Sequence, residues 1–460
     1  MSNEKILNGE NKKEAREVKG TREYLPAEQL VREKVLDILK GNFKRYGYGP
    51  IETSILELYD VAASKYGGGA EILKETYRLK DQGGRELCLR YELTFKFAKL
   101  IEMNPTIRLP FKRYEIGKVF RDGPVKTGRL REFTQCDVDV VGVKSLAADA
   151  EFIDMAFKVF AQLGLNVNVQ LNNRKVLFGL FSECRIAEKS HMDTALALDK
   201  LEKFGEDVVK KELLEKGIND ESIVKLFDIL YAVSQKQTNE EKLSFLGGLM
   251  QNELGAQGIK ELKEMLDYCI GFQTKGDLRF VPTLARGLGY YTGPMWEVYM
   301  NGDGKVKSSL AAGGRWDKMV QEFLNSKDEY PATGMTFGLD VIYAALEERK
   351  HVSVQSKLEH IPAVLIVPIN TLNICLELAS QLRSNEVSCD ISFDKKLGKA
   401  MDYANKQSIP FVAIVGEKEL KGKQVNIRDM ESGKEELYDL NTVGIRLKES
   451  LRLSEQTHHS

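Results

Sequence analysis

The chain has 460 residues, of which 42% are hydrophobic and 29% are charged, and its formal net charge is −1 at pH 7. This is the composition of a soluble globular protein, and the length predicts roughly two to four domains rather than one hydrophobic core. A net charge near zero provides no global basic field for DNA, and no apolar run reaches the ~18 residues of a membrane-spanning helix, so neither DNA nor a membrane is an expected partner.

Residues 1–18 are charged and lack the apolar centre of a signal peptide, so we expect a flexible lead-in. Apolar side chains recur near helical spacing over 27–46, which predicts a helix. Strand-like segments follow at 50–57, 76–79, 86–91, 112–121 and 131–142. A second helix is predicted over 145–163 and a further strand over 167–173.

The stretch from 185 to 275 has a different character from its flanks. Leu, Lys and Glu dominate it at helical spacing, and proline is absent. The β-rich pattern resumes at Arg279. We therefore predict a helical insertion over 185–275 that interrupts one core domain, formed by 19–184 and 276–346.

A separate unit is predicted over 360–460, after a charged linker over 347–359. Short apolar runs alternate in it with helix-like segments, at 363–369, 372–383, 387–393, 396–406 and 411–416. Buried apolar strands that alternate with helices are typical of a small parallel α/β module. The chain as a whole is therefore predicted to be an α+β protein with a second, smaller α/β domain.

The cysteines and histidines exclude several kinds of site. Six cysteines are scattered without any CxxC pair: Cys88, Cys136, Cys184, Cys269, Cys375 and Cys389. Without an export signal, free thiols in a reducing cytoplasm are expected and a zinc site is not. The five histidines lie outside the polar motifs, no serine or cysteine sits in a nucleophile elbow, and no Walker loop occurs. Hydrolytic triads and histidine-ligated metals are therefore not expected.

The run ARGLGYYTG, from Ala285 to Gly293, combines an arginine, three glycines and two tyrosines. Glycines beside Arg286 allow the backbone to approach a phosphate closely. The paired Tyr290 and Tyr291 offer a flat apolar wall with hydroxyls for a small polar ligand. A surface hairpin with tyrosines packed on its flank is the alternative interpretation.

The segment from Lys118 to Gly142 has two strand-like arms around a loop that holds Lys126 and Arg129. The strand period places one set of side chains on a single face of the second arm: Arg131, Phe133, Gln135, Asp137 and Asp139. An aromatic ring, an amide and two carboxylates make a poor core surface but a good binding floor for a polar or cationic ligand. The alternative is a solvated strand face with surface ion pairs.

Two further segments carry weaker signals. In AAGGRWDKM, from Ala311 to Met319, tandem glycines before Arg315 suggest backbone close to a ligand, and a tight turn explains them equally well. In LRYELTFKFA, Glu92 and Thr94 share a period-2 face, and Glu92 either binds an ammonium or lies in water. The arginines of these motifs suit a pocket that stabilises phosphate charge rather than one that relays protons.

Seven segments occur in the order typical of one enzyme family: KGTREYLPAE, GYGPIETSILE, LRYELT, FRDGPVKTGRLREFTQCDVD, LARGLGYYTG, AAGGRWD and GMTFGLD. Through them the chain resembles histidyl-tRNA synthetase, a class II aminoacyl-tRNA synthetase, over nearly its whole length. The resemblance implies an antiparallel-sheet catalytic domain with a helical insertion, plus a C-terminal α/β anticodon-binding domain. It also implies a homodimer that ligates L-histidine to tRNA(His) through a histidyl adenylate, with ATP as substrate and Mg²⁺ on its phosphates.

The resemblance implies roles at ATP for residues that match the family's motifs. Arg121 would hold the α-phosphate, and Phe133 would stack on adenine. Lys126 and Arg129 would approach the ATP phosphates and the acceptor end of tRNA. Arg286 would lie near the α-phosphate and the carboxylate of histidine, and it shares the catalytic role with Arg121.

The resemblance also implies three ligands for the ammonium of histidine: Glu92, Thr94 and Gln135. Asp139 and Tyr291 would read the imidazole, with Tyr290 beside them. No protein side chain is implied as a metal ligand.

Four positions depart from the family pattern. Gly289 stands where an aspartate is expected, Ser54 occupies the motif 1 proline position, and Gly123 occupies the motif 2 glutamate position. The most serious departure is in motif 3, where Val341 replaces an arginine that covers adenine and contacts the γ-phosphate.

Two hypotheses follow from these departures. The first is an active synthetase in which ATP contacts are redistributed, with Arg315 as the substitute. The second is a catalytically weak paralogue that acts as a regulatory or binding subunit, like the regulatory subunit of ATP phosphoribosyltransferase. The retained Arg121, Arg286, Gln135 and Tyr291 and the full C-terminal module favour the enzyme.

Overall fold

The protein is described by a computed structural model that covers residues 16–65, 70–286, 289–349, 361–393 and 396–457. Most of the predicted lead-in and most of the predicted linker lie outside these residues. The chain divides into two compact units, Met1–Glu23 with Arg32–His351, and Tyr24–Val31 with Val352–Ser460.

An eight-stranded sheet forms the centre of the first unit. Its strands follow in the order β1 (Gly49–Pro50), β5 (Phe111–Phe120), β6 (Glu132–Val141), β11 (Ala332–Gly338), β10 (Ala311–Arg315), β9 (Pro294–Met300), β7 (Val167–Asn173) and β8 (Asp277–Phe280). The outer pairs β1–β5 and β7–β8 are parallel, and every other pair is antiparallel. The two central strands, β6 and β11, therefore come from distant parts of the chain.

Helices cover one face of this sheet. They are α1 (Pro26–Arg45), which confirms the helix predicted over 27–46, and α5 (Ala147–Gln162), which confirms the helix over 145–163. Phe43 of α1 and Phe160 of α5 both contact the ring of Phe337, with centroids 5.9 and 5.8 Å away. Phe337 pairs with Cys136 of β6, so the apolar face of β6 meets these helices. The polar face of β6 points to the other side.

A small three-stranded sheet lies before the large one in the chain. It consists of β2 (Leu56–Leu58), β4 (Glu86–Leu89) and β3 (Arg78–Lys80), with the helices α2 (Tyr59–Lys65), α3 (Ala70–Lys74), α4 (Thr94–Met103) and α13 (Lys318–Leu324) in the same unit. The continuous strand predicted over 50–57 is wrong, because the segment divides between β1 and β2. Between them, the backbone N–H of Thr53 donates to the side chain of Glu115 (2.9 Å) and not to a neighbouring strand.

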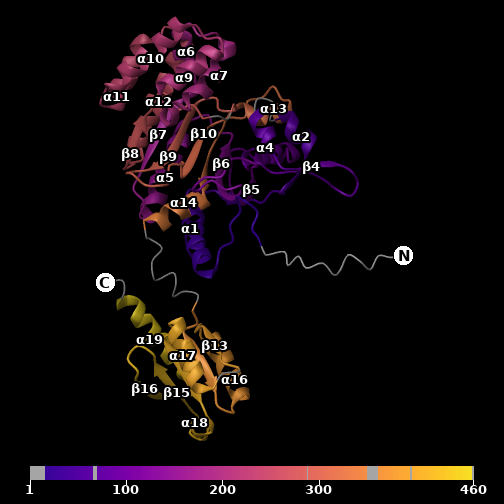
Figure 1. Ribbon diagram of the computed structural model, residues 1–460, viewed down its shortest axis with the longest axis vertical. Helices are drawn as coiled ribbons and strands as arrows, with labels where there is room; N and C mark the ends of the chain where they lie inside the picture. The colour runs from indigo at the N-terminus through magenta and orange to yellow at the C-terminus, as the bar shows by residue number, and fades with distance from the viewer. Residues whose placement is uncertain (1–15, 66–69, 287–288, 350–360, 394–395, 458–460) are drawn as a thin grey trace. The chain divides into compact units, whose positions relative to one another are not determined.

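The described residues between 185 and 275 form helices and no strand. In chain order these are η1 (Glu188–Ser190), α7 (His191–Leu198), α8 (Leu201–Phe204), α9 (Glu206–Glu215), α10 (Asp220–Ser234), α11 (Asn239–Leu249) and α12 (Glu253–Gly271). Figure 1 shows them gathered at one end of the sheet, near β7 and β8. They are joined to the sheet by α6 (Arg174–Glu183), which the sequence did not predict. α6 and α12 pack closely, since a Cβ at Gly179 would lie 2.4 Å from the Cα of Gly255.

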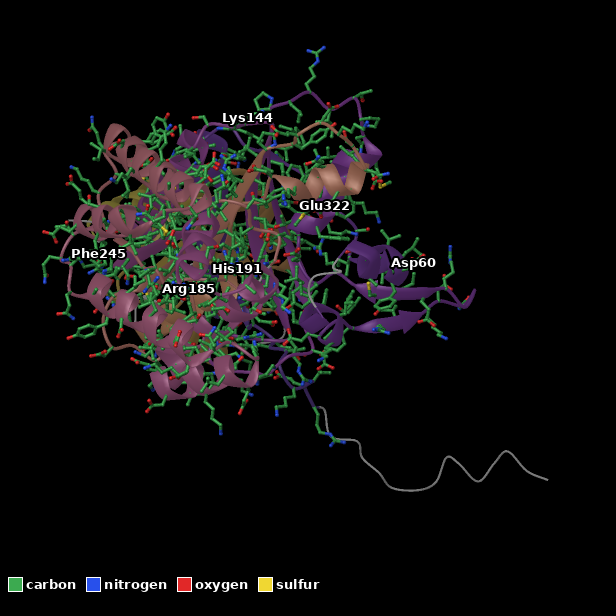
Figure 2. The ribbon with its side chains drawn as sticks, turned by 90° about the horizontal axis from the view of Figure 1, so that it is seen from above. Asp60, Lys144, Arg185, His191, Phe245 and Glu322 are labelled. Carbon is green, nitrogen blue, oxygen red and sulfur yellow. The ribbon has the colours of Figure 1, made fainter. Side chains whose placement is uncertain are left out.

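His191 begins α7 and is a core residue (Figure 2). Its ring lies 5.2 Å from that of Phe178 and 5.6 Å from that of Phe181, and its Nε2 is 3.1 Å from the carbonyl oxygen of Ile186. Burial lowers the pKa of the imidazole. These contacts give His191 a packing role.

The second unit contains a five-stranded sheet in the order β13 (Cys389–Ile391), β12 (Val364–Pro368), β14 (Phe411–Val415), β15 (Gln424–Asp429) and β16 (Glu435–Asp439). Its helices are α16 (Leu372–Ser384), α17 (Leu397–Gln407), α18 (Glu417–Lys421) and α19 (Val443–Thr457). The first three strands are parallel, as predicted, whereas β15 and β16 form an antiparallel extension. The expectation of a purely parallel module is therefore wrong. β16 escaped prediction because it is mostly exposed and has no apolar run.

Among the helices of the described part of the chain, none combines the length and apolar composition that a membrane crossing requires.

Candidate functional site

The polar face of the large sheet carries a buried ion pair at its centre. Arg113 on β5 lies directly opposite Asp139 on β6, and its Nη2 is 2.8 Å from Oδ2 of Asp139. Neither residue is more than 2% exposed. On the other side Asp139 faces Gly334 of β11, where an added Cβ would lie 1.8 Å from its Oδ1. The missing side chain at Gly334 is what leaves room for the carboxylate.

The neighbouring row of the sheet carries two more carboxylates. Glu115 on β5, Asp137 on β6 and Thr336 on β11 face one another across the strands. The hydroxyl of Thr94 donates to Oδ2 of Asp137 over 3.4 Å, which brings the start of α4 against this row. Asp137 is 2% exposed. The alternative of a solvated strand face is therefore wrong.

Glu92, which precedes α4, lies close to the carboxylate of Asp137. It is 3% exposed, and its Oε2 accepts a hydrogen bond of 3.3 Å from the hydroxyl of Tyr290. Burial raises the pKa of Glu92 to about 7; the charge of Asp137 acts in the same direction, and Arg121 and Arg286 act against it. These influences place both predicted arginines within electrostatic reach of the carboxylate. The interpretation that Glu92 lies in water is wrong.

Several polar oxygens at this site have no hydrogen-bond partner in the described parts of the chain: Oε1 of Glu92, Oε1 of Gln135 and Oδ1 of Asp137. All three residues are at most 7% exposed. Buried polar atoms are normally paired, so these oxygens require donors that a ligand can bring. An ammonium group supplies such donors.

Arg286 lies within electrostatic reach of Glu92. Its Nη1 donates to the carbonyl of Gly313 (3.2 Å), its Nε lies 3.4 Å from Oε1 of Glu297, and its guanidinium lies 5.1 Å from the ring centre of Tyr291. The backbone of Arg286 has a φ of +47°, which is uncommon for a residue other than glycine. The carboxylate of Asp199 accepts hydrogen bonds from the backbone of this segment. The segment is thus held between the sheet and the helical insertion.

The two tyrosines of the Ala285–Gly293 run also pack at the site. The rings of Tyr290 and Tyr291 lie 4.8 Å apart, and Tyr291 is 7% exposed. The alternative of a surface hairpin is wrong for the described residues. Residues 287 and 288, which are part of the predicted motif, lie outside them.

Arg121 lies between two aromatic rings. Its guanidinium is 4.2 Å from the ring centre of Tyr91 and 5.1 Å from that of Phe133, and its Nε donates to the carbonyl of Tyr91 (3.3 Å). Cations are attracted to the faces of aromatic rings at such distances. The structure therefore brings Arg121 and Phe133 together, as a nucleotide site with a stacked base and a phosphate would require.

The loop between β5 and β6 is a tight turn. Lys126 and Arg129 exchange backbone hydrogen bonds of 3.1 and 2.8 Å, and Gly128 between them has a φ of +73°. A Cβ at Gly128 would lie 3.4 Å from Cγ1 of Val341, so the residue that replaces the expected motif 3 arginine packs against this loop. Lys203 of α8 lies close enough to lower the pKa of Lys126.

Arg315 does not belong to this site. Its Nε and Nη2 both donate to Asp149, its Nη1 donates to Asp317 and to the carbonyl of Val143, and its Nη2 also donates to the carbonyl of Ser145. An arginine has five N–H donors, and all five are used. The expectation that Arg315 substitutes for the motif 3 arginine at ATP is therefore contradicted by its geometry.

The tandem glycines before Arg315 have a packing explanation. They form β10 rather than a tight turn. A Cβ at Gly314 would lie 2.7 Å from the ring of Tyr291, and one at Gly313 would lie 2.3 Å from the carbonyl oxygen of Gly334. The two glycines therefore allow the ring of Tyr291 and the neighbouring strand β11 to pack closely against β10.

Three residues with contacts at the site escaped the sequence interpretation: Tyr91, Arg113 and Glu297. Arg113 alternates with Glu115 along a strand that was predicted, so the same period-2 argument applied to β6 would have indicated it. Glu297 is a single acidic residue within the apolar run PMWEVYM. For Tyr91 the sequence offers no comparable signal.

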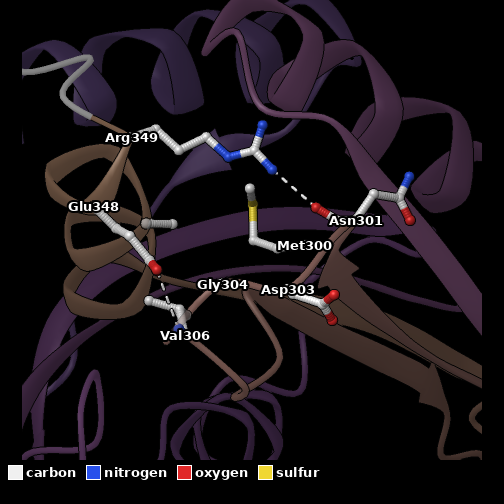
Figure 3. A pocket seen from close by; sticks show the side chains of 8 residues that line it. Met300, Asn301, Asp303, Gly304, Val306, Glu348 and Arg349 are labelled. Carbon is white, nitrogen blue, oxygen red and sulfur yellow. Dashed lines mark hydrogen bonds between the residues drawn. The ribbon is translucent and has the colours of Figure 1, made fainter.

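A separate pocket of about 300 Å³ lies at the end of β9 and α14 (Leu339–Glu348) (Figure 3). It is lined by Met300, Asn301, Asp303, Gly304, Val306, Ala345, Glu348 and Arg349. Glu348 accepts backbone N–H groups from Lys305 and Val306, and Arg349 donates to the carbonyl of Asn301. None of the predicted site residues lines this pocket. The side chains of Glu348 and Arg349 are already bound to backbone groups of residues at the pocket.

No group of three or more His, Cys, Asp or Glu side chains suited to a metal ion occurs within the described ranges.

Comparisons with known proteins extend over both units. A family model described as histidyl-tRNA synthetase matches residues 20–342, and one described as an anticodon binding domain matches residues 363–450. A curated relative from Bacillus anthracis, Histidine--tRNA ligase 1, is 45% identical over 433 residues, which is 94% of this chain and 99% of the relative.

Solved structures show the same fold. The histidyl-tRNA synthetase from Nostoc sp. PCC 7120 matches with a TM-score of 0.76 and 27% identity, covering 95% of this chain and 99% of the other. A Bacillus halodurans C structure, titled an ATP phosphoribosyltransferase regulatory subunit/histidyl-tRNA synthetase, matches with a TM-score of 0.68 and 20% identity. It covers 84% of this chain and 96% of its own, and at that identity it shares the fold alone.

Proposed function

The chain belongs to the histidyl-tRNA synthetase family, and we propose that the pocket between Glu92, Asp139 and Arg286 is where it binds and activates histidine. The protein is a histidine–tRNA ligase: it uses ATP to form histidyl adenylate and transfers the histidyl group to tRNA. The antiparallel catalytic sheet and the C-terminal anticodon-binding domain are those of the family.

The amino-acid end of the pocket supports binding of histidine. Its ammonium would be held by Glu92, Thr94 and Gln135. Oε1 of Glu92 and Oε1 of Gln135 have no partner among the described residues and can accept its N–H donors. Asp139 and Tyr291 would contact the imidazole. Tyr290, bound to Glu92, would position that carboxylate.

The arginines support the first chemical step. A histidine carboxylate oxygen attacks the α-phosphorus of ATP, the bond to the bridging oxygen breaks, and pyrophosphate leaves. The carboxylate is already ionised at neutral pH, so the step needs positioning and charge stabilisation more than a base. Arg121 and Arg286 are suited to this because a guanidinium stays charged and donates to phosphate with a planar fork.

Mg²⁺ would be carried mainly by the ATP phosphates. The ion prefers oxygen ligands and keeps several waters, and it commonly takes only one or two carboxylates from a protein. When bound, it neutralises charge on the phosphate oxygens.

The second step joins the histidyl group to tRNA. A ribose hydroxyl of the terminal adenosine attacks the carbonyl carbon of the adenylate, and AMP leaves. Lys126, which is exposed at the turn between β5 and β6, would contact a phosphate of the acceptor end. The anticodon-binding domain would contact the other end of tRNA(His).

We further propose a homodimer that acts in the cytoplasm. Leu56 and Leu58 of β2 and the preceding Ile55 are 49%, 43% and 41% exposed, so this edge offers an apolar surface for a second copy. The six cysteines are free in the described structure, which suits a reducing compartment.

The observation that carries the assignment of the site is the unpartnered Oε1 of the buried Glu92 within reach of Arg121 and Arg286. Histidine-dependent ATP–pyrophosphate exchange, followed by charging of tRNA(His), tests the activity. We expect both reactions with the full-length protein. No exchange from folded protein would favour the second candidate, a regulatory paralogue, which the shared fold of the Bacillus halodurans structure keeps as the alternative.

A further inference from the structure

The last residues of β7 anchor the stretch of chain that leads to Arg286. Asn172 is fully buried, and its Nδ2 donates to the carbonyl oxygens of Pro282 (3.0 Å) and Leu284 (2.9 Å). Its Oδ1 accepts the backbone N–H of Asn173 (2.8 Å), which fixes the orientation of the amide. The chain is therefore tied to β7 just before it reaches Arg286.

Arg174, which follows β7 directly, binds the Ala285–Gly293 run at two points. Its backbone N–H donates to the carbonyl oxygen of Gly293 (3.0 Å), and its Nη2 donates to the carbonyl oxygen of Arg286 (3.2 Å). The backbone donor is available because Arg174 is the first residue of α6, and N–H groups in the first turn of a helix have no partner within the helix. One residue thus holds the run at Arg286 and again at Gly293.

The side chain of Arg174 is itself held in place. Asn173 is the N-cap of α6, and its side chain accepts the backbone N–H of Lys175 (2.8 Å), which fixes the start of the helix. The guanidinium of Arg174 is 5.5 Å from the ring centre of Phe178, and its Nη1 is 3.9 Å from Sδ of Met192 in α7. Arg174 is only 4% exposed. Its Nη2 is therefore presented to the carbonyl of the run from a packed position between α6 and α7.

The backbone of Arg286 needs such support. Its φ of +47° lies in the left-handed region, which is unfavourable for a residue with a Cβ. A conformation of this kind persists only where surrounding contacts enforce it. The direction of a side chain follows from the backbone dihedrals, so a return to negative φ would carry the guanidinium of Arg286 away from the carbonyl of Gly313, to which its Nη1 now donates (3.2 Å).

We propose that Arg174 is a positioning residue for the formation of histidyl adenylate: its guanidinium holds the backbone of Arg286 in the left-handed conformation that directs the Arg286 guanidinium to the α-phosphate. This inference rests on the proposed function of Arg286. Arg174 donates to a carbonyl of the protein, so it acts on the reaction through Arg286 and not by contact with ATP.

The test is a double-mutant cycle on the affinity for histidyl sulfamoyl adenosine, a stable analogue of histidyl adenylate in which a sulfamoyl group replaces the phosphate. Calorimetry compares the full-length wild type with Arg174→Met, Arg286→Ala and the double variant. Methionine keeps an unbranched side chain but has no donor. Arg174→Met should weaken binding by at least about tenfold, because a small displacement of a positioned group costs that much or more.

The same substitution should cause no further loss in the Arg286→Ala background, because the guanidinium that Arg174 positions is then already absent. Equal losses in the two backgrounds would mean that Arg174 acts independently of Arg286, and they would overturn the inference. If Arg286→Ala did not weaken binding of the analogue, the proposed function of Arg286 would fail, and this inference would fail with it.

Two single variants serve as controls. Lys175→Met alters the next residue, whose ammonium binds Glu261 of α12 and not the run, and it should keep the wild-type affinity for the analogue. Arg174→Lys retains a cationic donor and should recover part of the affinity that Arg174→Met loses. Urea unfolding of each variant establishes that the titrated protein is folded.

Pyrophosphate exchange provides a second measurement. Arg174→Met should lower kcat by at least about tenfold, whereas the KM for histidine should stay close to that of the wild type. The KM should stay because histidine is proposed to bind Glu92, Gln135 and Asp139, which Arg174 does not hold. A purely structural role predicts lower stability with a wild-type kcat for the folded fraction, and that result would overturn the inference.

Discussion

Gly334 and Asp139 lie opposite each other on the two central strands, and a Cβ at Gly334 would occupy a position 1.8 Å from Oδ1 of Asp139. The carboxylate that is proposed to read the imidazole therefore owes its position to the absence of a side chain on the next strand. A contact of that length cannot form without displacing the carboxylate. Adding one methyl group at position 334 therefore tests whether the position of Asp139 matters for histidine binding.

Gly334→Ala should displace Asp139 and weaken histidine binding by at least about tenfold, because the ion pair with Arg113 and the imidazole contact depend on the same carboxylate. The KM for ATP should change much less. The measurement is pyrophosphate exchange as a function of each substrate. The control is Gly248→Ala in α11, where an added Cβ meets nothing within 4 Å. A Gly334→Ala enzyme with a wild-type KM for histidine would contradict the assignment.

Arg286→Ala should abolish pyrophosphate exchange and leave histidine binding largely intact. The guanidinium is proposed to stabilise charge that develops on phosphate, whereas the ammonium and imidazole are held by other residues. Exchange and direct histidine titration distinguish the two effects. Arg279→Ala serves as control, because Arg279 is exposed and pairs with Asp277 on its own strand. Persistent exchange near the wild-type rate would remove Arg286 from the phosphate site.

Asp139→Asn should weaken histidine affinity by about 1.5–3 kcal/mol, the usual contribution of a hydrogen bond to a charged group. Calorimetric titration with histidine measures this change. ATP binding in the absence of histidine should not change, because Arg121 contacts the rings of Tyr91 and Phe133, and Phe133 lies near the start of β6 whereas Asp139 lies near its end. Unchanged histidine affinity would show that Asp139 does not contact the imidazole.

The same carboxylate predicts a pH dependence of stability. Burial raises the pKa of Asp139 from 3.8 to about 8, so the folded state binds more protons than the unfolded state between these values. The free energy of unfolding should therefore fall as pH rises through this window. Urea unfolding between pH 5 and about 8.5 should show a flatter profile for Asp139→Asn than for the wild type. A profile equally steep in both proteins would mean that another group causes the dependence.

Arg315→Met should destabilise the protein by about 3–5 kcal/mol, because it leaves Asp149 buried without its cation. The folded fraction of the Arg315→Met protein should have the same KM for ATP as the wild type. Urea unfolding and exchange kinetics measure the two effects. Lys144→Ala, which removes an exposed ion pair with Glu329, should leave stability unchanged. A raised KM for ATP in Arg315→Met would restore Arg315 to the nucleotide site.

The period-2 argument predicted the polar face of β6 because a strand presents alternate residues to one side whatever its neighbours are. The alternation along one strand does not say which residues of the adjacent strands lie beside Asp139. Arg113 meets Asp139 through the register of β5 on β6, and Gly334 meets it through β11, about 200 residues later in the chain. Prediction failed where local pattern was silent, as at the exposed β16, or where a backbone N–H found a side chain, as at Thr53.

The sequence by itself determined the family and the types of residue at the site, because motifs such as LARGLGYYTG place specific side chains at short spacings along the chain. It also determined that the arginine expected at position 341 is a valine. The tertiary structure alone decided what each charge faces. Arg315 carries the same motif signal as Arg286, yet the guanidinium of Arg315 is bound by Asp149, Asp317 and two backbone carbonyls, whereas Arg286 lies within electrostatic reach of Glu92. Strand order and helix packing select these partners from distant segments, and the spacing of residues along the chain does not encode that selection.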